Sequence, residues 1–322
     1  MKISIALATF NGGKYLQEQL DSFLNQNRLP DELVVCDDGS NDETLSILEG
    51  FSEKAPFPVK IYLNEKNLGY SQNFSKALAL CEGDLIFLSD QDDVWLPDKI
   101  NIVMQRFDER PEVQLIIHDL DYCKENMTPI GQTKIERMSG FFDLQKDYVV
   151  GMATAIRGDF LRLCLPIPDN REVGHDNWLH DCSNVVEGKA IIEDVLALHR
   201  RHVSNATASN GLNMDFVTDR NYFYRNVRLM SKTPIEYEAP SALYGWMQER
   251  KLLLSELGYV QLSCLNKKIE KQKFLVSSLK RRSSIHAAPR MSRLRLILSL
   301  YVDGGYAFFS GLRSAVKDLV GN

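Results

Sequence analysis

The feature that most constrains the fold is a unit that recurs along the first ninety residues: a short apolar run, a polar turn and then a helical pattern. Within each run the apolar residues are nearly continuous, which is typical of strands buried on both faces of a sheet. The four runs occupy residues 3–9, 32–36, 59–63 and 85–88. Strands that alternate with amphipathic helices predict an α/β fold, with a mainly parallel sheet and helices on both of its faces.

Polar residues collect where these predicted strands end. In parallel sheets a ligand binds in the crevice beyond the carboxyl ends of the strands, so this edge is the expected place for a site. The polar residues at or just after the strand ends are Asn11, Asp37, Asp38, Asn67, Asp90, Asp92 and Asp93. Because the same placement recurs at successive strands, the sequence indicates a ligand site at this edge.

The sharpest cluster is Asp90-Gln91-Asp92-Asp93, which places three carboxylates within four residues. Carboxylates this close repel one another unless a divalent cation or a donor-rich ligand neutralises them. Mg²⁺ usually takes one or two carboxylates together with substrate phosphate oxygens, so the cluster fits a metal-diphosphate site. The alternative is an acidic helix N-terminus, in which Asp92 or Asp93 caps the helix that Pro97 helps to begin.

Two further motifs each have a structural and a functional interpretation. Asp37-Asp38-Gly39-Ser40 is compatible with an Asx turn and a helix cap. A carboxylate at this strand end is equally able to accept a hydrogen bond from the imide N–H of a uracil or thymine ring. Asn67-Leu68-Gly69 follows the third strand and is, by itself, most often only a turn.

Together these motifs resemble the family 2 glycosyltransferases, which have the GT-A fold. The likeness rests on the order and spacing of Ala8-Thr9-Phe10-Asn11, the motif at Asp37–Ser40, the motif at Asn67–Gly69 and Asp90-Gln91-Asp92-Asp93-Val94-Trp95. It covers roughly residues 1–205. The resemblance implies transfer of a sugar from a nucleotide-diphosphate donor, usually with inversion at the anomeric carbon.

The resemblance also implies roles for individual residues on the donor side. Asp38 matches the carboxylate that recognises the base, and Asp90 and Asp92 match the two ends of the family's D-x-D motif. By this likeness Asp92 holds a divalent metal, Mg²⁺ or Mn²⁺, on the diphosphate, and Asp90 contacts ribose or metal-bound water. The other nucleotide-sugar-binding residues expected from the matched motifs are Ala8, Thr9, Asn11, Asn67 and Gly69.

Inverting transfer needs a general base on the acceptor hydroxyl. The family supplies this base as an acid at the start of a downstream helix, and Gly174-His175-Asp176-Asn177-Trp178 looks like that segment. Asp176 is therefore the candidate base. The alternative is that Asp176 only caps its helix, a position where Asp is common.

A basic segment, His199-Arg200-Arg201-His202, resembles a later family segment that approaches the diphosphate. The family usually shows an aromatic residue where this chain has His199, whereas Arg200 and His202 fit the pattern. A cation there would stabilise charge on the departing nucleotide, so Arg200 and His202 are expected to bind the nucleotide-sugar. His202 is also a candidate ligand of the metal.

Beyond residue 111 the alternation is less regular. We expect strands near residues 113–118 and 149–156, a loop through residues 124–140, helices near 158–163 and 176–186, and short strands at 190–192 and 195–198. After residue 210 the periodicity is helical. These patterns predict a catalytic domain at residues 1–208 and a helical extension at residues 209–322.

The extension is basic, because residues 261–322 hold 12 Lys or Arg and 3 Asp or Glu. Basic residues interleaved with apolar ones suit peripheral contact with an anionic membrane. A solvated basic face packed on the acidic catalytic domain or on another subunit suits them equally. The remaining residues are acidic overall, which argues against nucleic acid as a partner. Six cysteines without a C-x-x-C pair, and an N-terminus that lacks a signal segment, favour a cytoplasmic protein, with a possible location at the inner face of the plasma membrane.

The specific form Asp-Gln-Asp-Asp-Val-Trp, followed by His-Asp-x-Trp, looks like the bacterial branch that builds O-antigen, capsule and related polysaccharides. Rhamnosyltransferases are common in that branch. The resemblance therefore implies a metal-dependent inverting transferase that moves a sugar from dTDP-rhamnose or a UDP-hexose to a surface polysaccharide or lipid-linked oligosaccharide. One alternative is a nucleotidyltransferase, for which Asn11-Gly12-Gly13-Lys14 is a thin match. Another is a catalytically silent scaffold that binds nucleotide-sugars.

Overall fold

The chain divides into two compact units. The structure, a computed structural model, describes residues 1–140, 142–170, 173–202, 235–309 and 311–320. The first unit holds the described residues up to 202 apart from Asn170, and the second holds those from 235 onward. The predicted domain boundary, between residues 208 and 209, lies outside the described residues.

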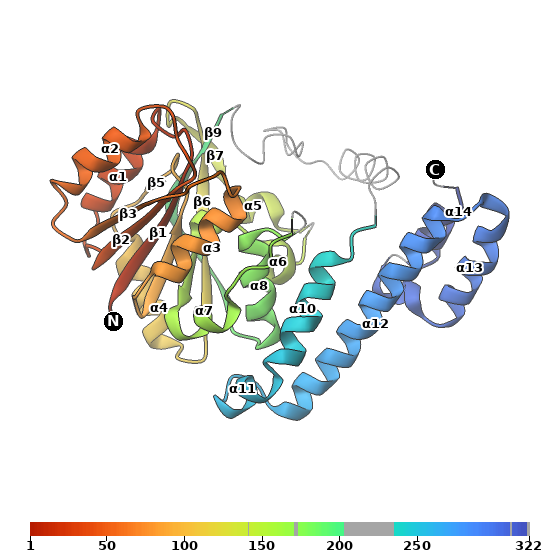
Figure 1. The fold of residues 1–322 in the computed structure, drawn as a ribbon. Helices are drawn as coiled ribbons and strands as arrows, with labels where there is room; N and C mark the ends of the chain where they lie inside the picture. Colours follow the sequence, from red (N-terminus) through yellow and green to blue (C-terminus); the bar gives the residue numbers. More distant parts are fainter. Residues whose placement is uncertain (141, 171–172, 203–234, 310, 321–322) are drawn as a thin grey trace. The chain divides into compact units, whose positions relative to one another are not determined.

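The first unit is built on one mixed sheet, whose strand order is β3-β2-β1-β4-β8-β6-β9-β5 (Figure 1). The first half is parallel, as predicted, and consists of β1 (Ile3–Thr9), β2 (Glu32–Asp37), β3 (Val59–Leu63) and β4 (Leu85–Ser89). Thr9 aligns with Asp37, and Asp37 with Leu63. The carboxyl ends of these strands therefore lie in register at one edge.

The second half of the sheet is where the prediction departs from the structure. The strand expected at residues 149–156 is only β8 (Thr154–Arg157), preceded by the short helix η1 (Gly151–Ala153), and β8 runs antiparallel to β4 and β6. β6 (Leu115–Lys124) runs parallel to β9 (Lys189–Arg201), which joins the two short predicted strands into one irregular strand. β5 (Val94–Trp95) pairs with β9.

The loop expected at residues 124–140 is wrong, because it contains β7 (Pro129–Thr133) and α5 (Lys134–Met138). Both form through distant contacts that a local pattern does not reveal. β7 is an edge strand paired with β6, and the Asp119 carboxylate accepts a hydrogen bond from the first turn of α5 at Ile135 N–H. Thr133 and Glu136 form a capping box that begins the helix.

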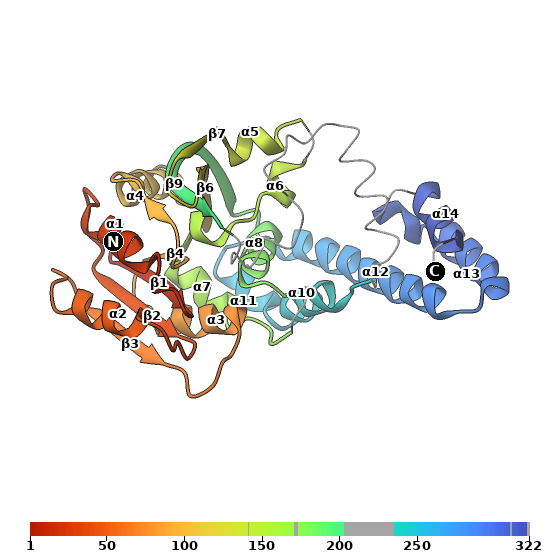
Figure 2. The same ribbon diagram turned by 90° about the horizontal axis from the view of Figure 1, so that it is seen from above.

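Helices cover both faces of the parallel half (Figures 1 and 2). The chain moves in one direction from β1 to β3 and returns to β4, so right-handed crossovers place α1 and α2 on one face and α3 on the other. These helices are α1 (Leu16–Leu24), α2 (Thr44–Ser52) and α3 (Tyr70–Leu80). The others in this unit are α4 (Lys99–Glu109), α6 (Leu144–Asp147), α7 (Gly158–Cys164) and α8 (His175–Val185); α7 and α8 confirm two predicted helices.

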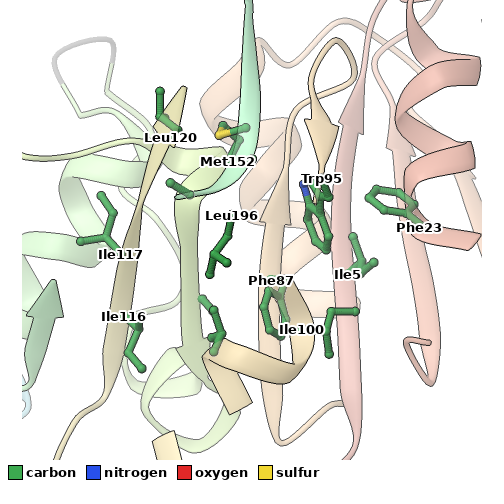
Figure 3. Packing of buried hydrophobic residues seen from close by; sticks show 14 of the residues in the cluster. Ile5, Phe23, Phe87, Trp95, Ile100, Ile116, Ile117, Leu120, Met152 and Leu196 are labelled. Atoms are coloured by element: carbon green, nitrogen blue, oxygen red, sulfur yellow. The ribbon is translucent and has the colours of Figure 1, made fainter. Parts of the chain in front are cut away.

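The core of this unit packs the sheet against the helices (Figure 3). Ile5 of β1 and Phe87 of β4 are fully buried, and Phe23 of α1 meets the Trp95 ring edge-on with 4.8 Å between centroids. Burial of each such side chain contributes about 1.5–3 kcal/mol to folding. The core thereby holds the strand ends rigid beneath the polar edge.

The second unit is helical, as predicted. It contains α10 (Glu238–Glu249), α11 (Lys251–Glu256), α12 (Leu262–Ala287), α13 (Arg290–Val302), η3 (Gly305–Phe308) and α14 (Leu312–Val320). The buried Asp318 carboxylate joins three of these elements, because it accepts hydrogen bonds from Arg282, His286 and Tyr306. None of the helices in the described part of the chain is long and apolar enough to cross a membrane.

Candidate active site

The loop after β1 is fastened to the loop after β2. The Asn11 N–H donates to Ser40 Oγ at 2.8 Å, and the Asn11 side-chain oxygen accepts from the Asn41 N–H at 2.9 Å. Asn11 has a φ of 48°, a left-handed conformation that Asn tolerates better than most residues. Gly12 N–H donates to Thr44 Oγ1 in the same way. The two predicted nucleotide-binding segments therefore form one surface.

Asp37 and Asp38 have separate partners. The Asp37 carboxylate accepts hydrogen bonds from the Thr9 hydroxyl at 2.8 Å and from the Ser40 hydroxyl and N–H. Asp37 thus forms the Asx turn that the structural interpretation of the Asp37–Ser40 motif predicted. That interpretation leaves the neighbouring Asp38 for another role.

Asp38 binds the loop after β3. Its carboxylate accepts from Leu68 N–H at 2.7 Å, Gly69 N–H at 2.9 Å and the Asn64 side-chain amide at 2.8 Å. Asn67 donates its side-chain amide to the Asp38 carbonyl at 3.1 Å. Among the described residues, Asp38 Oδ2 accepts a hydrogen bond only from Gly69, which leaves this oxygen an acceptor lone pair. The structure thus brings Asp38, Asn67 and Gly69 together.

Gln91 aligns the acidic loop with the first loop, a contact that the sequence did not suggest. Its side-chain amide forms a reciprocal pair with the backbone of Phe10: Phe10 N–H donates to Gln91 Oε1 at 2.9 Å, and Gln91 Nε2 donates to Phe10 O at 3.0 Å. A neutral amide between carboxylates is the only local signal of this role. Gly12 faces the same side chain so closely that a Cβ there would lie 2.2 Å from Gln91 Oε1.

The acidic loop concentrates negative charge around Asp90. Burial raises the pKa of Asp90 well above its ordinary value, and the nearby carboxylates of Asp93, Asp92 and Asp176 raise it further. The Lys99 ammonium acts in the opposite direction. The electrostatic effect of Asp176 places the candidate base in the neighbourhood of the acidic loop, although it lies 86 positions along the chain.

Asp93 is fully buried and structural. Its Oδ1 accepts from the Arg200 N–H at 3.0 Å and lies 3.1 Å from His199 Nδ1. The helix-cap alternative for Asp92 and Asp93 is wrong, because α4 begins at Lys99 and its N-cap position is Asp98. The acidic cluster is therefore not explained as a helix N-terminus.

Lys99 is a buried cation beneath the acidic loop. Its ammonium lies 3.6 Å from the Trp95 ring centroid and donates to the Met152 carbonyl at 2.7 Å. Burial lowers the pKa of Lys99 well below its ordinary value, while Asp93 and Asp90 act to raise it. Lys99 thus offsets part of the negative charge from the protein side.

Asp92 faces His202, with 2.8 Å between Asp92 Oδ2 and His202 Nε2. The His202 ring packs against Tyr15 with 4.7 Å between centroids. His202 is 6% exposed and the Asp92 side chain 16%, so the pair is largely shielded but still reached from solvent. The structure brings together these two predicted metal ligands.

The Arg200 guanidinium makes its contacts with other groups of the protein. Its guanidinium donates to the Asp92 carbonyl at 2.9 Å, the Glu125 carbonyl at 2.5 Å and the Glu18 carboxylate at 2.8 Å. It also lies over the Tyr15 ring, 4.6 Å from the centroid, and is 2% exposed. These contacts join β9 to α1 and to the acidic loop; binding of diphosphate by Arg200 stays a prediction.

Asp176 lies in the first turn of α8 and is half-buried. Its Oδ1 accepts from the Asn177 N–H at 2.8 Å, and no side chain caps α8 at Gly174. The neighbouring His175 stacks on Phe74 at 4.0 Å, and burial lowers its pKa. Both ring nitrogens of His175 are buried without a hydrogen-bond partner among the described residues. The other carboxylate oxygen of Asp176 has the chemistry that a base requires.

The protein side chains at the acidic loop supply only some of the ligands that a divalent cation needs. Within the described ranges, no group of three or more His, Cys, Asp or Glu side chains has the arrangement of a metal site. Asp92 and His202 nevertheless present an oxygen and a nitrogen at 2.8 Å, beside the crowded carboxylate of Asp90. Two protein ligands suffice where substrate phosphate oxygens and water complete the coordination, so these residues fit Mg²⁺ or Mn²⁺ held together with a diphosphate.

Comparisons with known proteins agree with this architecture. Residues 4–162 match the model of "Glycosyl transferase family 2". An uncharacterized glycosyltransferase of Nostoc sp. is 27% identical over 64% of this chain and 66% of its own length. The abequosyltransferase of Salmonella typhimurium is 29% identical over 36% of this chain and 35% of its own length. The chain thus spans less than two thirds of these curated relatives.

A solved structure is similar over nearly the whole chain. S. aureus TarS residues 1–349, in complex with UDP-GlcNAc, matches with a TM-score of 0.57 at 17% identity, covering 99% of this chain and 89% of that one. At this identity the likeness shows the fold alone, and it confirms the expected GT-A arrangement. With the family match and the four strand-end motifs in place, residues 4–162 of this chain form a domain of glycosyl transferase family 2.

Proposed function

We propose that this chain transfers a sugar from a nucleoside-diphosphate donor to a hydroxyl of a growing surface polysaccharide or lipid-linked oligosaccharide, with inversion at the anomeric carbon. The observation that supports the proposal is a chain of contacts: Asp38 binds the loop after β3, Gln91 of the acidic loop binds the loop after β1, and the Asp176 carboxylate at the start of α8 acts on Asp90. A transferase of this kind needs one group for the donor base, one for the diphosphate and one for the acceptor.

The donor's nucleoside would lie against the joined loops after β1 and β2. Ala8, Thr9 and Asn11 form one wall, and the free lone pair of Asp38 Oδ2 would accept the imide N–H of the base. The Gly69 N–H holds that carboxylate from the other side, and the Asn67 side-chain amide binds the Asp38 backbone carbonyl. Uracil and thymine present the same imide edge, so this geometry supports either a UDP-hexose or dTDP-rhamnose as donor.

The diphosphate would lie at the acidic loop. Asp92 and His202 would hold Mg²⁺ or Mn²⁺, and a cation bound there would neutralise charge on the leaving diphosphate. Asp90 would contact ribose or metal-bound water. Arg200 positions the loop from behind through the Asp92 carbonyl.

Asp176 would accept the proton of the acceptor hydroxyl during attack on the anomeric carbon. Inversion follows if attack comes from the side opposite the leaving diphosphate, which requires the base to stand apart from the acidic loop. Asp176 suits this role because it belongs to α8 and not to the acidic loop, while its charge still acts on Asp90. The buried, unpartnered His175 supports it by packing the start of α8 against Phe74.

The relatives support the substrate class at a coarser level. TarS is described in complex with UDP and UDP-GlcNAc, and one relative is named an abequosyltransferase. We also propose action in the cytoplasm, because all six cysteines are free thiols and five of them are buried.

The test replaces the proposed metal ligand Asp92 by Ala and measures thermal stabilisation by UDP-GlcNAc and by dTDP-rhamnose, each with Mn²⁺ and with EDTA. A ligand that binds only the folded state raises its melting temperature. Wild type should show a shift that needs Mn²⁺, and Asp92→Ala should lose it. Asp108→Ala, which removes an exposed carboxylate of α4, is the matched control and should keep the shift.

Two results would contradict the proposal. An equal shift with EDTA would remove the metal from donor binding. Metal-dependent donor binding by wild type without any release of nucleoside diphosphate, in the presence of lipid-linked oligosaccharide acceptors, would favour the alternative of a catalytically silent scaffold.

A further inference from the structure

Helix α13 presents an apolar stripe to solvent. Its inner face is closed, because Ile297 is 5% exposed and Leu300 is fully buried. Successive residues on a helix are 100° apart, so the positions three, four and seven residues along lie on one side. Four exposed apolar side chains of α13 follow this spacing: Leu294 at 52%, Leu298 at 55%, Tyr301 at 47% and Val302 at 82%. Leu296, at 40%, is also exposed but lies about 200° around the helix from Leu294.

Helix α14 repeats the pattern. Ala315 and Asp318 are buried, and the exposed apolar residues are Leu312 at 65%, Val316 at 51% and Leu319 at 37%. Their spacing again places them on one side of the helix. A shared cluster that includes Leu300 and Ala315 lies beneath the two helices, so both stripes belong to one packed pair.

Positive charge borders both stripes. Arg295 follows Leu294, Arg313 follows Leu312 and Lys317 follows Val316, so each cation lies about 100° around its helix from a stripe residue. Arg295 and Arg313 are exposed. Long cationic side chains beside an apolar stripe are suited to reach the headgroups of a bilayer while the stripe enters its interface.

Negative charge near these borders is confined to one exposed carboxylate, Asp303, which is paired with Arg281. The only carboxylates in the sequence of residues 288–319 are Asp303 and Asp318. Asp303 accepts from Arg281 at 2.8 Å, and Asp318 is buried and bound by Arg282. Both are thereby neutralised from α12. A second copy of this pair would bring arginines against arginines, with only the exposed Asp303, already paired with Arg281, to balance them, whereas an anionic surface is complementary.

We propose that α13 and α14 bind the surface of an anionic lipid bilayer, with their apolar stripes in the interface and their cations on the headgroups. The proposal does not rest on sugar transfer, since every residue that carries it lies in the helical unit. It narrows the expected membrane contact of the basic extension to α13 and α14, where the exposed apolar stripes lie.

The experiment measures sedimentation of the full chain with vesicles of phosphatidylcholine alone and of equal parts phosphatidylcholine and phosphatidylglycerol. Wild type should bind the anionic vesicles, bind neutral ones far more weakly, and dissociate as salt rises. Leu298→Ser should weaken binding by roughly tenfold or more, and Arg313→Gln by roughly fivefold. Leu252→Ser, which changes an equally exposed leucine of α11, should bind as wild type does.

Unchanged melting temperatures will show that these surface variants fold. Equal binding of Leu298→Ser and Leu252→Ser, equal binding to both kinds of vesicle, or no binding by wild type would each overturn the proposal. Light scattering tests the alternative that a second copy of the chain covers the stripes. A wild-type dimer that Leu298→Ser converts to a monomer would support this alternative and overturn the proposal. Donor binding by the other unit is measured separately, so either proposal can fail alone.

Discussion

Arg200 makes the most quantitative prediction, because its contacts are buried and its replacement by Met keeps much of its apolar volume. Arg200→Met removes the donors to the carbonyls of Asp92 and Glu125, which then lack this partner, and the ion pair with Glu18. Glu18 is 54% exposed, so that pair contributes little. The two carbonyls dominate, and we expect a loss of about 3–5 kcal/mol in the free energy of unfolding.

The assay is thermal unfolding of the ligand-free protein. For a unit of this size each kcal/mol lowers the melting temperature by roughly 2–4 °C, so Arg200→Met should melt roughly 6–20 °C below wild type. Arg162→Met is the matched control, because it breaks an exposed pair with Asp159 and should change the melting temperature little. Equal melting temperatures for the two variants would refute the structural role. Weaker donor binding at unchanged stability would instead assign Arg200 to the diphosphate.

Two further substitutions test the charges of the first unit. Asp90→Asn should raise the ligand-free melting temperature by a few degrees at neutral pH, because the folded pKa of Asp90 lies well above the unfolded one and its ionised form costs stability. Wild type should lose stability relative to Asp90→Asn as pH rises from the ordinary pKa of Asp towards the raised folded one. If Asp90→Asn and wild type have the same melting temperature throughout pH 5 to 8, this expectation is contradicted. Burial lowers the pKa of Lys189 from 10.5 to about 8, so between these values the unfolded chain binds more protons and stability rises with pH. Lys189→Met should remove this rise, which the urea midpoints of both proteins at pH 7.5 and 10 would show. An equal rise of the midpoint in wild type and Lys189→Met would refute this prediction.

The parallel half of the sheet and its motifs were predictable because buried parallel strands leave nearly continuous apolar runs. β1, β2, β3 and β4 lie where those runs predicted them. Their carboxyl ends meet by topology, so the motifs could be assigned to one edge without coordinates. The family resemblance then supplied roles that the residues alone left open.

What the sequence did not reveal depends on contacts between distant residues. β7 contains Pro129 and Gly131, which disfavour a strand locally, yet pairing with β6 makes it one. Gln91 is an ordinary amide until the fold brings Phe10 against it. Arg200 looks like a free cation until Glu18 and Glu125 are placed beside it.

The different roles of the three carboxylates in the acidic loop are another feature that the sequence did not reveal. Three neighbouring carboxylates look alike in the sequence, but the fold gives them different surroundings. Asp93 is fully buried against β9, Asp92 faces His202, and Asp90 carries a raised pKa. Only tertiary placement separates the structural carboxylate from the two that remain for a ligand.

The central claim, that this edge of the sheet performs inverting transfer with Asp176 as base, is tested most directly by one paired measurement on Asp176→Asn. Affinity for the donor nucleotide-sugar and release of its nucleoside diphosphate are measured on the same protein, with Asp181→Asn, an exposed carboxylate of the same helix, as control. We predict donor affinity within about twofold of wild type and a fall in release of roughly hundredfold or more. Release by Asp176→Asn at the rate of Asp181→Asn would contradict the claim.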